Sequence, residues 1–305
     1  MNNSIRVGTR KSPLAEWQAQ TVINLLAQQG HHAEIVFIKS EGDLNLTTPL
    51  YELGIQGIFT KSLDIALLEN RIDIAVHSYK DVPTLMAEGL IATAVLERGN
   101  PFDVLVCKNR EALIDLQNDA PLTIATSSIR RKAQWLHAHN HSRIENIRGN
   151  VNSRLQKLKD SSWHGAIFAA AGLERLGFTE GETGPHVQLH SMLPAPAQGA
   201  IVLVGRKNDS ATIDTCVNLN HIPTQICTQA ERDFLRLLHG GCSTPISAYA
   251  TISGNEINFK GNITSPDGSE SISVELKSSA TNFADIARDA AEQIISKGGK
   301  DLLKK

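Results

Sequence analysis

The sequence predicts an α/β fold: two α/β domains with a cleft between them, followed by a small α+β domain with a three-stranded antiparallel sheet. Three observations lead to this prediction. Short apolar runs alternate with helical stretches through the first two thirds of the chain, which is typical of parallel sheets. After about residue 220 the pattern changes to a helix, alternating stretches separated by turns, and a final helix. A chain of 305 residues also exceeds what one hydrophobic core usually organises.

Composition excludes several classes of protein. Hydrophobic residues make up 41% and charged residues 20%, as in soluble globular proteins. The net charge of −2 argues against a general binder of nucleic acid or of membrane surfaces, and no apolar run approaches the ~20 residues of a membrane helix. No signal peptide is evident at the N-terminus. The cysteines form no Cys-x-x-Cys pair, so we expect a cytoplasmic protein with reduced thiols and without a metal site.

The first domain is expected to begin with a strand, a helix and a second strand. The strands are assigned to residues 5–9 and 34–38. Between them, Ser12 caps the helix, Pro13 occupies its first position and Gly30 ends it. This unit favours a parallel sheet. A long mobile loop at 39–57 and a helix at 60–69 are expected to follow.

The next strand, at residues 72–76, leads into a tight loop that Pro83 closes. Ser78, Lys80 and Asp81 stand at the exit of this strand. In an open α/β sheet, ligands bind at the carboxyl ends of the strands. A carboxylate beside a cation can hold a charged substrate or move a proton there. The alternative interpretation is a solvated loop with an incidental ion pair.

The same pattern repeats after a linker at 97–101. Further strands are expected at residues 122–125, 143–147 and 166–169. The proline-rich segment 193–199 then leads to a strand at 200–204, which we expect to return to the first sheet. The predicted domains are 1–97 together with 199–219, then 98–198, and finally 220–305.

The third domain is expected to open with a helix. Thr228 and Glu231 have the spacing of a capping box, and Gly240 and Gly241 are expected to stop the helix after His239. An antiparallel sheet and a last amphipathic helix follow.

Arginines are placed where the predicted strands end. Six of them lie near strand exits or in the helices that begin there, namely Arg10, Arg130, Arg131, Arg148, Arg154 and Arg175. The arginine side chain presents a rigid fork that matches carboxylates and phosphates. Two such domains facing each other would form a cleft for a polyanion on a protein that is not basic overall. The alternative is a set of surface arginines in separate ion pairs.

Cys242 follows a double glycine just beyond a predicted helix C-terminus. The partial negative charge of a helix C-terminus disfavours a thiolate, so this is a poor setting for a nucleophile that must be regenerated in every turnover. A loop cysteine can still serve as a one-time attachment point, and a small apolar filler is the alternative.

Several short motifs together resemble one known family. Examples are His-Ser-Tyr-Lys-Asp-Val-Pro at 77–83 and Gly-Gly-Cys-Ser-Thr-Pro at 240–245. Further matching segments are residues 5–15, 126–131, 148–151 and 171–173. In this order they resemble the porphobilinogen deaminase (hydroxymethylbilane synthase) family. The resemblance implies a monomer of three domains, the first two built like periplasmic binding proteins.

The resemblance also implies a chemistry. The family joins porphobilinogen units head to tail into hydroxymethylbilane and releases ammonia, within haem and porphyrin biosynthesis. Its primer is a dipyrromethane cofactor held through a thioether, and the matching cysteine is Cys242. Asp81 matches the acid/base carboxylate, and Gln18 and Gln198 are weaker candidates for binding the carboxylate side chains of the pyrroles. The residues expected to bind acetate and propionate side chains are Arg10, Ser12, Ser78, Lys80, Thr126, Ser127, Ser128, Arg130, Arg131, Arg148, Asn150, Arg154 and Arg175.

The sequence departs from the family pattern at two positions. Gln56 stands where the family usually has a lysine, and Ser62 replaces a usual acidic residue. The loop around them, with Phe59, is expected to close over the cleft, so the lost cation is expected to weaken substrate capture or to alter loop closure without abolishing activity. Two alternatives are a non-catalytic anion-binding module of the periplasmic-binding-protein type and an inactive relative that acts as a regulator.

Overall fold

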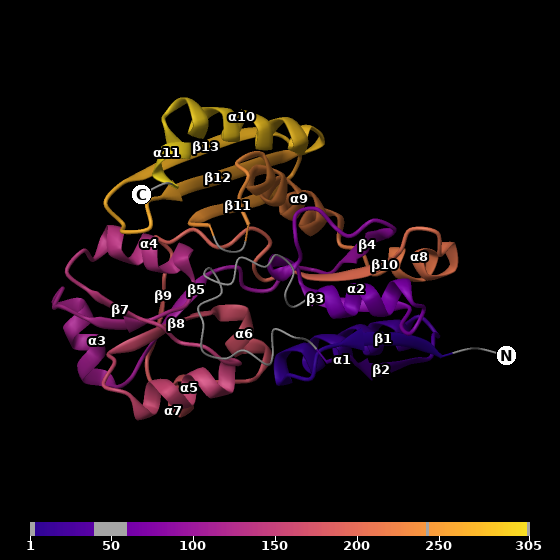
Figure 1. Ribbon diagram of the computed structural model, residues 1–305, viewed down its shortest axis with the longest axis horizontal. Helices are drawn as coiled ribbons and strands as arrows, with labels where there is room; N and C mark the ends of the chain where they lie inside the picture. The colour runs from indigo at the N-terminus through magenta and orange to yellow at the C-terminus, as the bar shows by residue number, and fades with distance from the viewer. Residues whose placement is uncertain (1–3, 40–59, 242–243, 304–305) are drawn as a thin grey trace. The chain divides into compact units, whose positions relative to one another are not determined.

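The computed structural model describes residues 4–39, 60–241 and 244–303 (Figure 1). The predicted loop at 39–57, with Gln56, lies outside these residues except for Lys39, and so do Phe59 and Cys242. The described residues form two compact units. One contains residues up to 99 and 199–225, and the other contains 100–198 and the chain from 226 onward.

The first unit is built on a five-stranded sheet with the order β2-β1-β3-β10-β4. Its strands are β1 (Ile5–Thr9), β2 (Ala33–Phe37), β3 (Ile74–Ser78), β4 (Leu90–Val95) and β10 (Ile201–Arg206). Its helices are α1 (Pro13–Gln28), α2 (Lys61–Leu68), the short 3₁₀ helix η2 (Tyr79–Asp81) and α8 (Ser210–Val217). β1 pairs in parallel with β2 and β3, whereas β10 runs antiparallel to β3 and β4. The prediction that the strand near 200–204 returns to the first sheet is therefore confirmed.

Local chemistry explains where α1 begins and ends. The Ser12 hydroxyl accepts a hydrogen bond from the Ala15 backbone N–H, and Pro13 occupies the first turn, where its missing N–H costs nothing. Gly30 adopts φ 83°, a left-handed conformation that glycine adopts without steric penalty. The predicted limits of this helix are confirmed.

The second unit contains a five-stranded sheet with the order β7-β6-β8-β5-β9. Its strands are β5 (Asp103–Cys107), β6 (Thr123–Ala125), β7 (Arg143–Glu145), β8 (Gly165–Ala169) and β9 (His186–Gln188). Its helices are α3 (Arg110–Gln117), α4 (Ile129–Ala138), α5 (Val151–Asp160), α6 (Ala170–Arg175) and α7 (Glu180–Thr183). β6 is parallel to β7 and β8, and β5 is antiparallel to β8 and β9.

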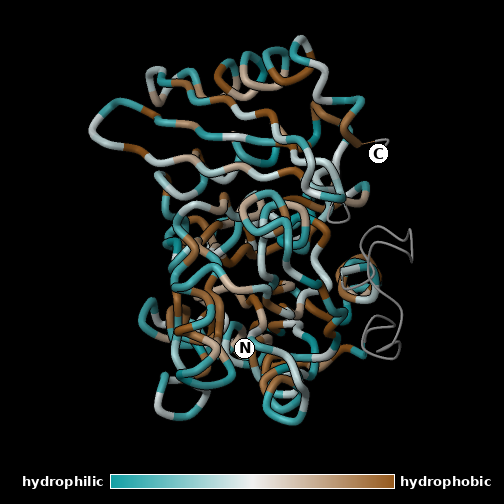
Figure 2. The backbone as a smooth tube through the Cα atoms, turned by 90° about the vertical axis from the view of Figure 1, so that its left-hand side faces the viewer, coloured by the Kyte–Doolittle hydropathy of each residue, from teal (hydrophilic) through white to brown (hydrophobic). Residues whose placement is uncertain are grey.

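The chain ends in an antiparallel sheet with the order β11-β12-β13. The strands of this sheet are β11 (Ile246–Ser253), β12 (Glu256–Thr264) and β13 (Ser271–Ser279). The helices of this part of the chain are α9 (Ile222–Leu237), the 3₁₀ helix η3 (Ala280–Asn282), α10 (Phe283–Ser296) and α11 (Gly299–Leu302). α10 alternates between hydrophobic and hydrophilic residues, and its apolar side contributes Ile286, Ala290 and Ile294 to the core (Figure 2). The predicted fold class is thus confirmed in its three sheets.

The predicted capping box of the third domain is wrong. Thr228 and Glu231 are fully buried inside α9, which begins earlier, next to His221. At that start the Thr224 backbone N–H donates to Nδ1 of His221 over 3.3 Å. The end of the helix also differs, because it closes at Leu237. His239, with φ 55°, takes the left-handed position that we expected of a glycine.

Glu231 is buried because it has partners outside its own helix. Its Oε2 accepts from the Ala197 backbone N–H at 2.7 Å, and its Oε1 accepts from the Ala250 backbone N–H at 2.8 Å. A Thr-x-x-Glu spacing is the same inside a helix as at its start, so spacing alone could not separate the two cases.

The side chain of Gln134 links α4 to the last sheet. Its side-chain amide exchanges two hydrogen bonds with the Leu193 backbone, at 2.9 and 3.0 Å, and donates to Oγ of Ser247 at 3.0 Å.

Within the residues that the structure describes, no helix is both long and apolar enough to cross a membrane.

Candidate functional site

The first group of candidate residues lies at one edge of the first sheet. β1 and β3 are neighbouring parallel strands, so their carboxyl ends meet at the same edge. Arg10 directly follows β1, Ser78 ends β3, and Lys80 and Asp81 lie in η2 immediately beyond it. The predicted strand exit is confirmed, and the structure brings these polar residues to it because two parallel strands end there.

One glutamine–serine hydrogen bond shapes this edge. Nε2 of Gln18, on α1, donates to Oγ of Ser78 at 2.8 Å. Ser12, by contrast, is engaged as the cap of α1.

His77, in β3, is an unusual residue that the sequence analysis did not select as a candidate for the site. It is only 6% exposed, and its Nε2 has no hydrogen-bond partner among the described residues. Burial, together with the smaller effect of the nearby positive charge of Arg10, lowers the pKa of His77 to about 3. The imidazole is therefore neutral at ordinary pH.

The second group of candidates lies at an edge of the second sheet. β7, β6 and β8 are adjacent and parallel, so the residues that follow them share one edge. The hydroxyl-rich turn and the candidate arginines come after these strands, namely Thr126, Ser127, Ser128, Arg130, Arg131, Arg148, Asn150, Arg154 and Arg175.

Several of these polar groups already make hydrogen bonds within the loops. Ser128 caps α4 by accepting from the Arg131 backbone N–H, and Asn150 caps α5 by accepting from the Ser153 backbone N–H at 2.9 Å. The Ser127 hydroxyl donates to the Ile147 carbonyl. These side chains therefore shape the loops whatever else they bind.

The remaining arginines of this edge are partly or fully removed from water. Arg148 is 4% exposed, and burial lowers its pKa. Burial also lowers the pKa of Arg175 to about 10, against the opposite effect of the Glu174 charge. Nε of Arg154 donates to the Gly149 carbonyl at 2.7 Å. Buried guanidinium groups favour an anionic ligand, because its charge offsets the cost of burying theirs.

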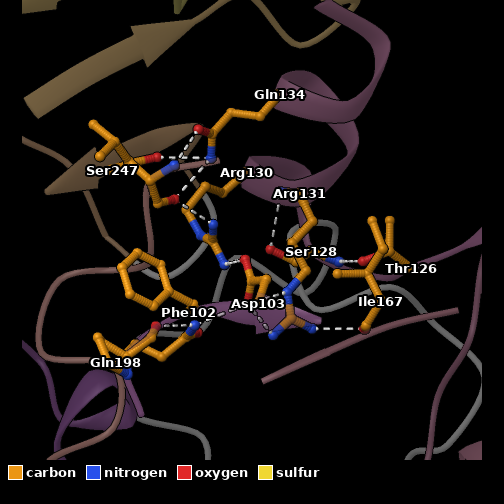
Figure 3. A network of polar contacts seen from close by, with 12 residues as sticks. Phe102, Asp103, Thr126, Ser128, Arg130, Arg131, Gln134, Ile167, Gln198 and Ser247 are labelled. Atoms are coloured by element: carbon orange, nitrogen blue, oxygen red, sulfur yellow. Dashed lines mark hydrogen bonds and ion pairs between the residues drawn. The ribbon is translucent and has the colours of Figure 1, made fainter. Parts of the chain in front are cut away.

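Arg130 and Arg131 are held by a residue that sequence reasoning missed, Asp103 (Figure 3). Asp103 opens β5 and is completely buried, and both guanidinium groups contact its carboxylate, at 2.7 and 2.8 Å. Gln198 donates to the same carboxylate at 2.8 Å. The alternative of surface arginines in separate ion pairs does not hold for this pair, since two buried arginines share one acid.

The positive charges of Arg130 and Arg131 keep the buried carboxyl group of Asp103 ionised. Burial alone would raise the pKa of Asp103, but the charges of Arg130 and Arg131 and the hydrogen bonds from Arg131 and Gln198 hold it far below its usual range. Burial lowers the pKa of Arg130, which Asp103 partly offsets. A signal for Asp103 existed in the sequence: a carboxylate that begins an apolar buried run requires a partner.

Comparison with known proteins identifies the family. The family model described as porphobilinogen deaminase, dipyromethane cofactor binding domain, matches residues 5–214. The model of the porphobilinogen deaminase C-terminal domain matches residues 225–296. The chain belongs to the porphobilinogen deaminase family. The resemblance seen in the sequence is thereby confirmed.

Curated porphobilinogen deaminases are similar along nearly the whole chain. The protein of Desulforamulus reducens is 37% identical over 305 residues, which cover 99% of this chain and 98% of that protein. A chloroplastic porphobilinogen deaminase of Oryza sativa subsp. japonica is 40% identical over 307 residues, covering 97% of this chain and 84% of that protein. The protein of Chlorobium phaeobacteroides is 38% identical over 311 residues, covering 99% and 98%.

Among solved structures, the chain is similar to a periplasmic substrate-binding protein of an ABC transporter from Coxiella burnetii. The TM-score is 0.43 at 14% identity, with 72% of this chain and 93% of that chain covered.

Proposed function

We propose that this member of the porphobilinogen deaminase family is a transferase that joins porphobilinogen units head to tail. It releases ammonia at each step, and hydrolysis with one water then releases the chain from the primer as hydroxymethylbilane for porphyrin and haem biosynthesis. The observation that carries the proposal is the gathering of arginines at the carboxyl edge of β7, β6 and β8, in a chain that belongs to this family.

The arginines suit the substrate and the primer because every pyrrole unit brings an acetate and a propionate. Arg148 is buried and Arg175 is half-buried, and burial lowers the pKa of both, so a bound carboxylate would stabilise their charged forms. The residues present therefore fit an anionic dipyrromethane. When bound, this group supplies the covalent primer for chain growth through a thioether to Cys242. Its carboxylates would be held by Thr126, Ser127, Ser128, Arg130, Arg131, Arg148, Asn150, Arg154 and Arg175.

Asp81 supplies the negative charge that the reaction needs. In each step the C–N bond of an aminomethyl group breaks and the nitrogen leaves as ammonia. The methylene carbon then bonds to the free ring carbon at the end of the chain, which loses a proton. An ionised Asp81 stabilises the positive charge that develops on the pyrrole and assists the departure of nitrogen. Arg10, Ser78 and Lys80, at the same sheet edge, hold the substrate carboxylates.

We also propose that the chain acts as a cytoplasmic monomer of three domains, without a nucleic-acid or membrane partner. The proposed domains are 1–97 with 199–219, 98–198, and 220–305. The placement of β10 in the first sheet and the presence of a separate antiparallel sheet at the end of the chain support this division. Light scattering coupled to size-exclusion chromatography tests the monomer.

The experiment that tests the function is the intact mass of the purified protein before and after incubation with porphobilinogen. We expect an added mass of two linked pyrroles on the wild-type protein and none on Cys242→Ala. Cys227→Ala removes a buried cysteine of α9 and serves as the matched control, which should keep the added mass. A wild-type chain that stays unmodified after incubation would contradict the proposal and leave a plain anion-binding module.

A further inference from the structure

The cluster around Asp103 holds two arginine side chains in fixed orientations. Arg131 donates to Oδ1 of Asp103 from Nε at 3.1 Å and from the terminal Nη2 at 2.8 Å, and its Nη1 donates to the Ile167 carbonyl at 2.9 Å. Arg130 donates to Oδ2 at 2.7 Å and to the Leu193 carbonyl at 2.7 Å. A planar guanidinium that is held on two sides cannot turn freely.

Asp103 is the centre from which both arginines are aligned. Figure 3 shows the two guanidinium groups converging on its carboxylate from α4. Asp103 itself cannot move far, because it belongs to β5 and its backbone pairs with Ala169 of β8. Gln198 fixes Oδ1 from a third direction, since its Nε2 also donates to the Pro101 carbonyl at 2.7 Å.

The cluster also has a definite charge. Two buried cations share one buried anion, so Asp103, Arg130 and Arg131 together carry a formal charge of +1. Burying an uncompensated charge is costly, and one carboxylate of a ligand would complete the set. With an uncharged residue in place of Asp103, the pair would carry +2 and the two forks would repel each other.

We infer that Asp103 is a positioning residue: it orients Arg130 and Arg131 and adjusts their combined charge to receive one carboxylate of the pyrrole chain. This inference rests on the proposed function. Asp103 touches neither substrate nor primer in this scheme and acts only through the two arginines.

The chain offers a matched control in Asp73. Its carboxylate also receives two arginines, from Nη2 of Arg6 at 2.7 Å and from Nη2 of Arg206 at 3.2 Å. Asp73 precedes β3 and therefore lies at the opposite end of that strand from Ser78 and Asp81. Asp73→Asn thus removes the same kind of contact away from the candidate site.

The experiment compares wild type, Asp103→Asn and Asp73→Asn during incubation with porphobilinogen. The intact mass is followed over time, and folding is checked by circular dichroism and thermal melting. We expect both variants to melt at lower temperature. Asp73→Asn should acquire the added mass at the wild-type rate, and Asp103→Asn at least about tenfold more slowly. The NMR signal of the Arg131 Nε–H should be protected from exchange in wild type and Asp73→Asn, and lost in Asp103→Asn.

The outcomes separate a structural role from a positioning role. Equal loading rates in the two variants, despite lowered melting temperatures, would overturn the inference while the proposed function stands. A wild type that does not load would overturn the proposed function and the inference together. Should Asp103→Asn fail to fold, Gln198→Met keeps all three charges and removes one bond to Oδ1. We expect it to slow loading about threefold, and an unchanged rate would then overturn the inference.

Discussion

The side-chain amide of Gln18 donates a hydrogen bond of 2.8 Å to the hydroxyl of Ser78 and thereby joins α1 to the end of β3. Gln18 is only 2% exposed, so water does not compete for this bond. The bond fixes the last residue of β3, three positions before Asp81. The geometry of the Asp81 turn therefore depends on α1.

Replacement of Gln18 by leucine is expected to lower kcat/KM for porphobilinogen about fivefold. The loss corresponds to one hydrogen bond worth about 1 kcal/mol. Steady-state kinetics measure it. Gln20→Leu, on the same helix, is the control, because Gln20 is exposed and donates to Asn24 within the helix. Equal losses in both variants would show that Ser78 needs no support from α1.

Replacement of Asp81 by asparagine is expected to lower kcat by about 100-fold or more, because the variant keeps the shape of the side chain but loses its charge. Single-turnover measurements of ammonia release with the loaded protein provide the rate. Glu88→Gln removes an exposed carboxylate a few residues away and should leave kcat unchanged. An Asp81→Asn protein with wild-type kcat would exclude the role proposed for this carboxylate.

His77 is expected to make the stability of the protein depend on pH. Burial lowers the pKa of His77 to about 3, below the ordinary value of 6.5, so the folded protein keeps the neutral form. As the pH falls below about 6.5, His77 binds a proton in the unfolded chain but not in the folded protein. The free energy of unfolding therefore decreases until the pH reaches about 3. Between about pH 7 and pH 5 this effect amounts to about 1–2 kcal/mol.

The measurement is the free energy of unfolding in urea at several pH values. His77→Leu should show a flatter dependence on pH than wild type over this range. His32→Leu replaces an exposed histidine of the same unit and should keep the wild-type slope. Identical slopes for wild type and His77→Leu would contradict the expectation.

Glu231→Gln is expected to destabilise the protein by about 1–3 kcal/mol. The buried carboxylate accepts from the backbone N–H groups of Ala197 and Ala250, and an amide nitrogen in place of one oxygen would face a donor with another donor. Urea unfolding measures the change, with the exposed Glu292→Gln on α10 as control. A loss below a few tenths of a kcal/mol would mean that these two contacts are dispensable.

The sequence by itself determined the fold class, the family and the positions of the candidate residues along the chain. Strands and helices follow from the spacing of apolar residues along the chain, which is a local property. The caps at Ser12 and Gly30 are local as well, because they depend on a side chain that bonds to nearby backbone and on the backbone freedom of glycine. The arginines could be assigned to strand exits for the same reason. Parallel neighbours in a sheet then bring successive exits to one edge.

Only the tertiary structure decided which side chains meet. Asp103 bonds to Arg130 across 27 positions of the chain, Gln18 to Ser78 across 60, and Glu231 to the Ala197 backbone across 34. Sheet order and the need to satisfy buried polar groups select such partners, and no local pattern encodes them. For this reason Thr228 and Glu231 were assigned to a helix start, and the shared acid of Arg130 and Arg131 emerged only from the fold.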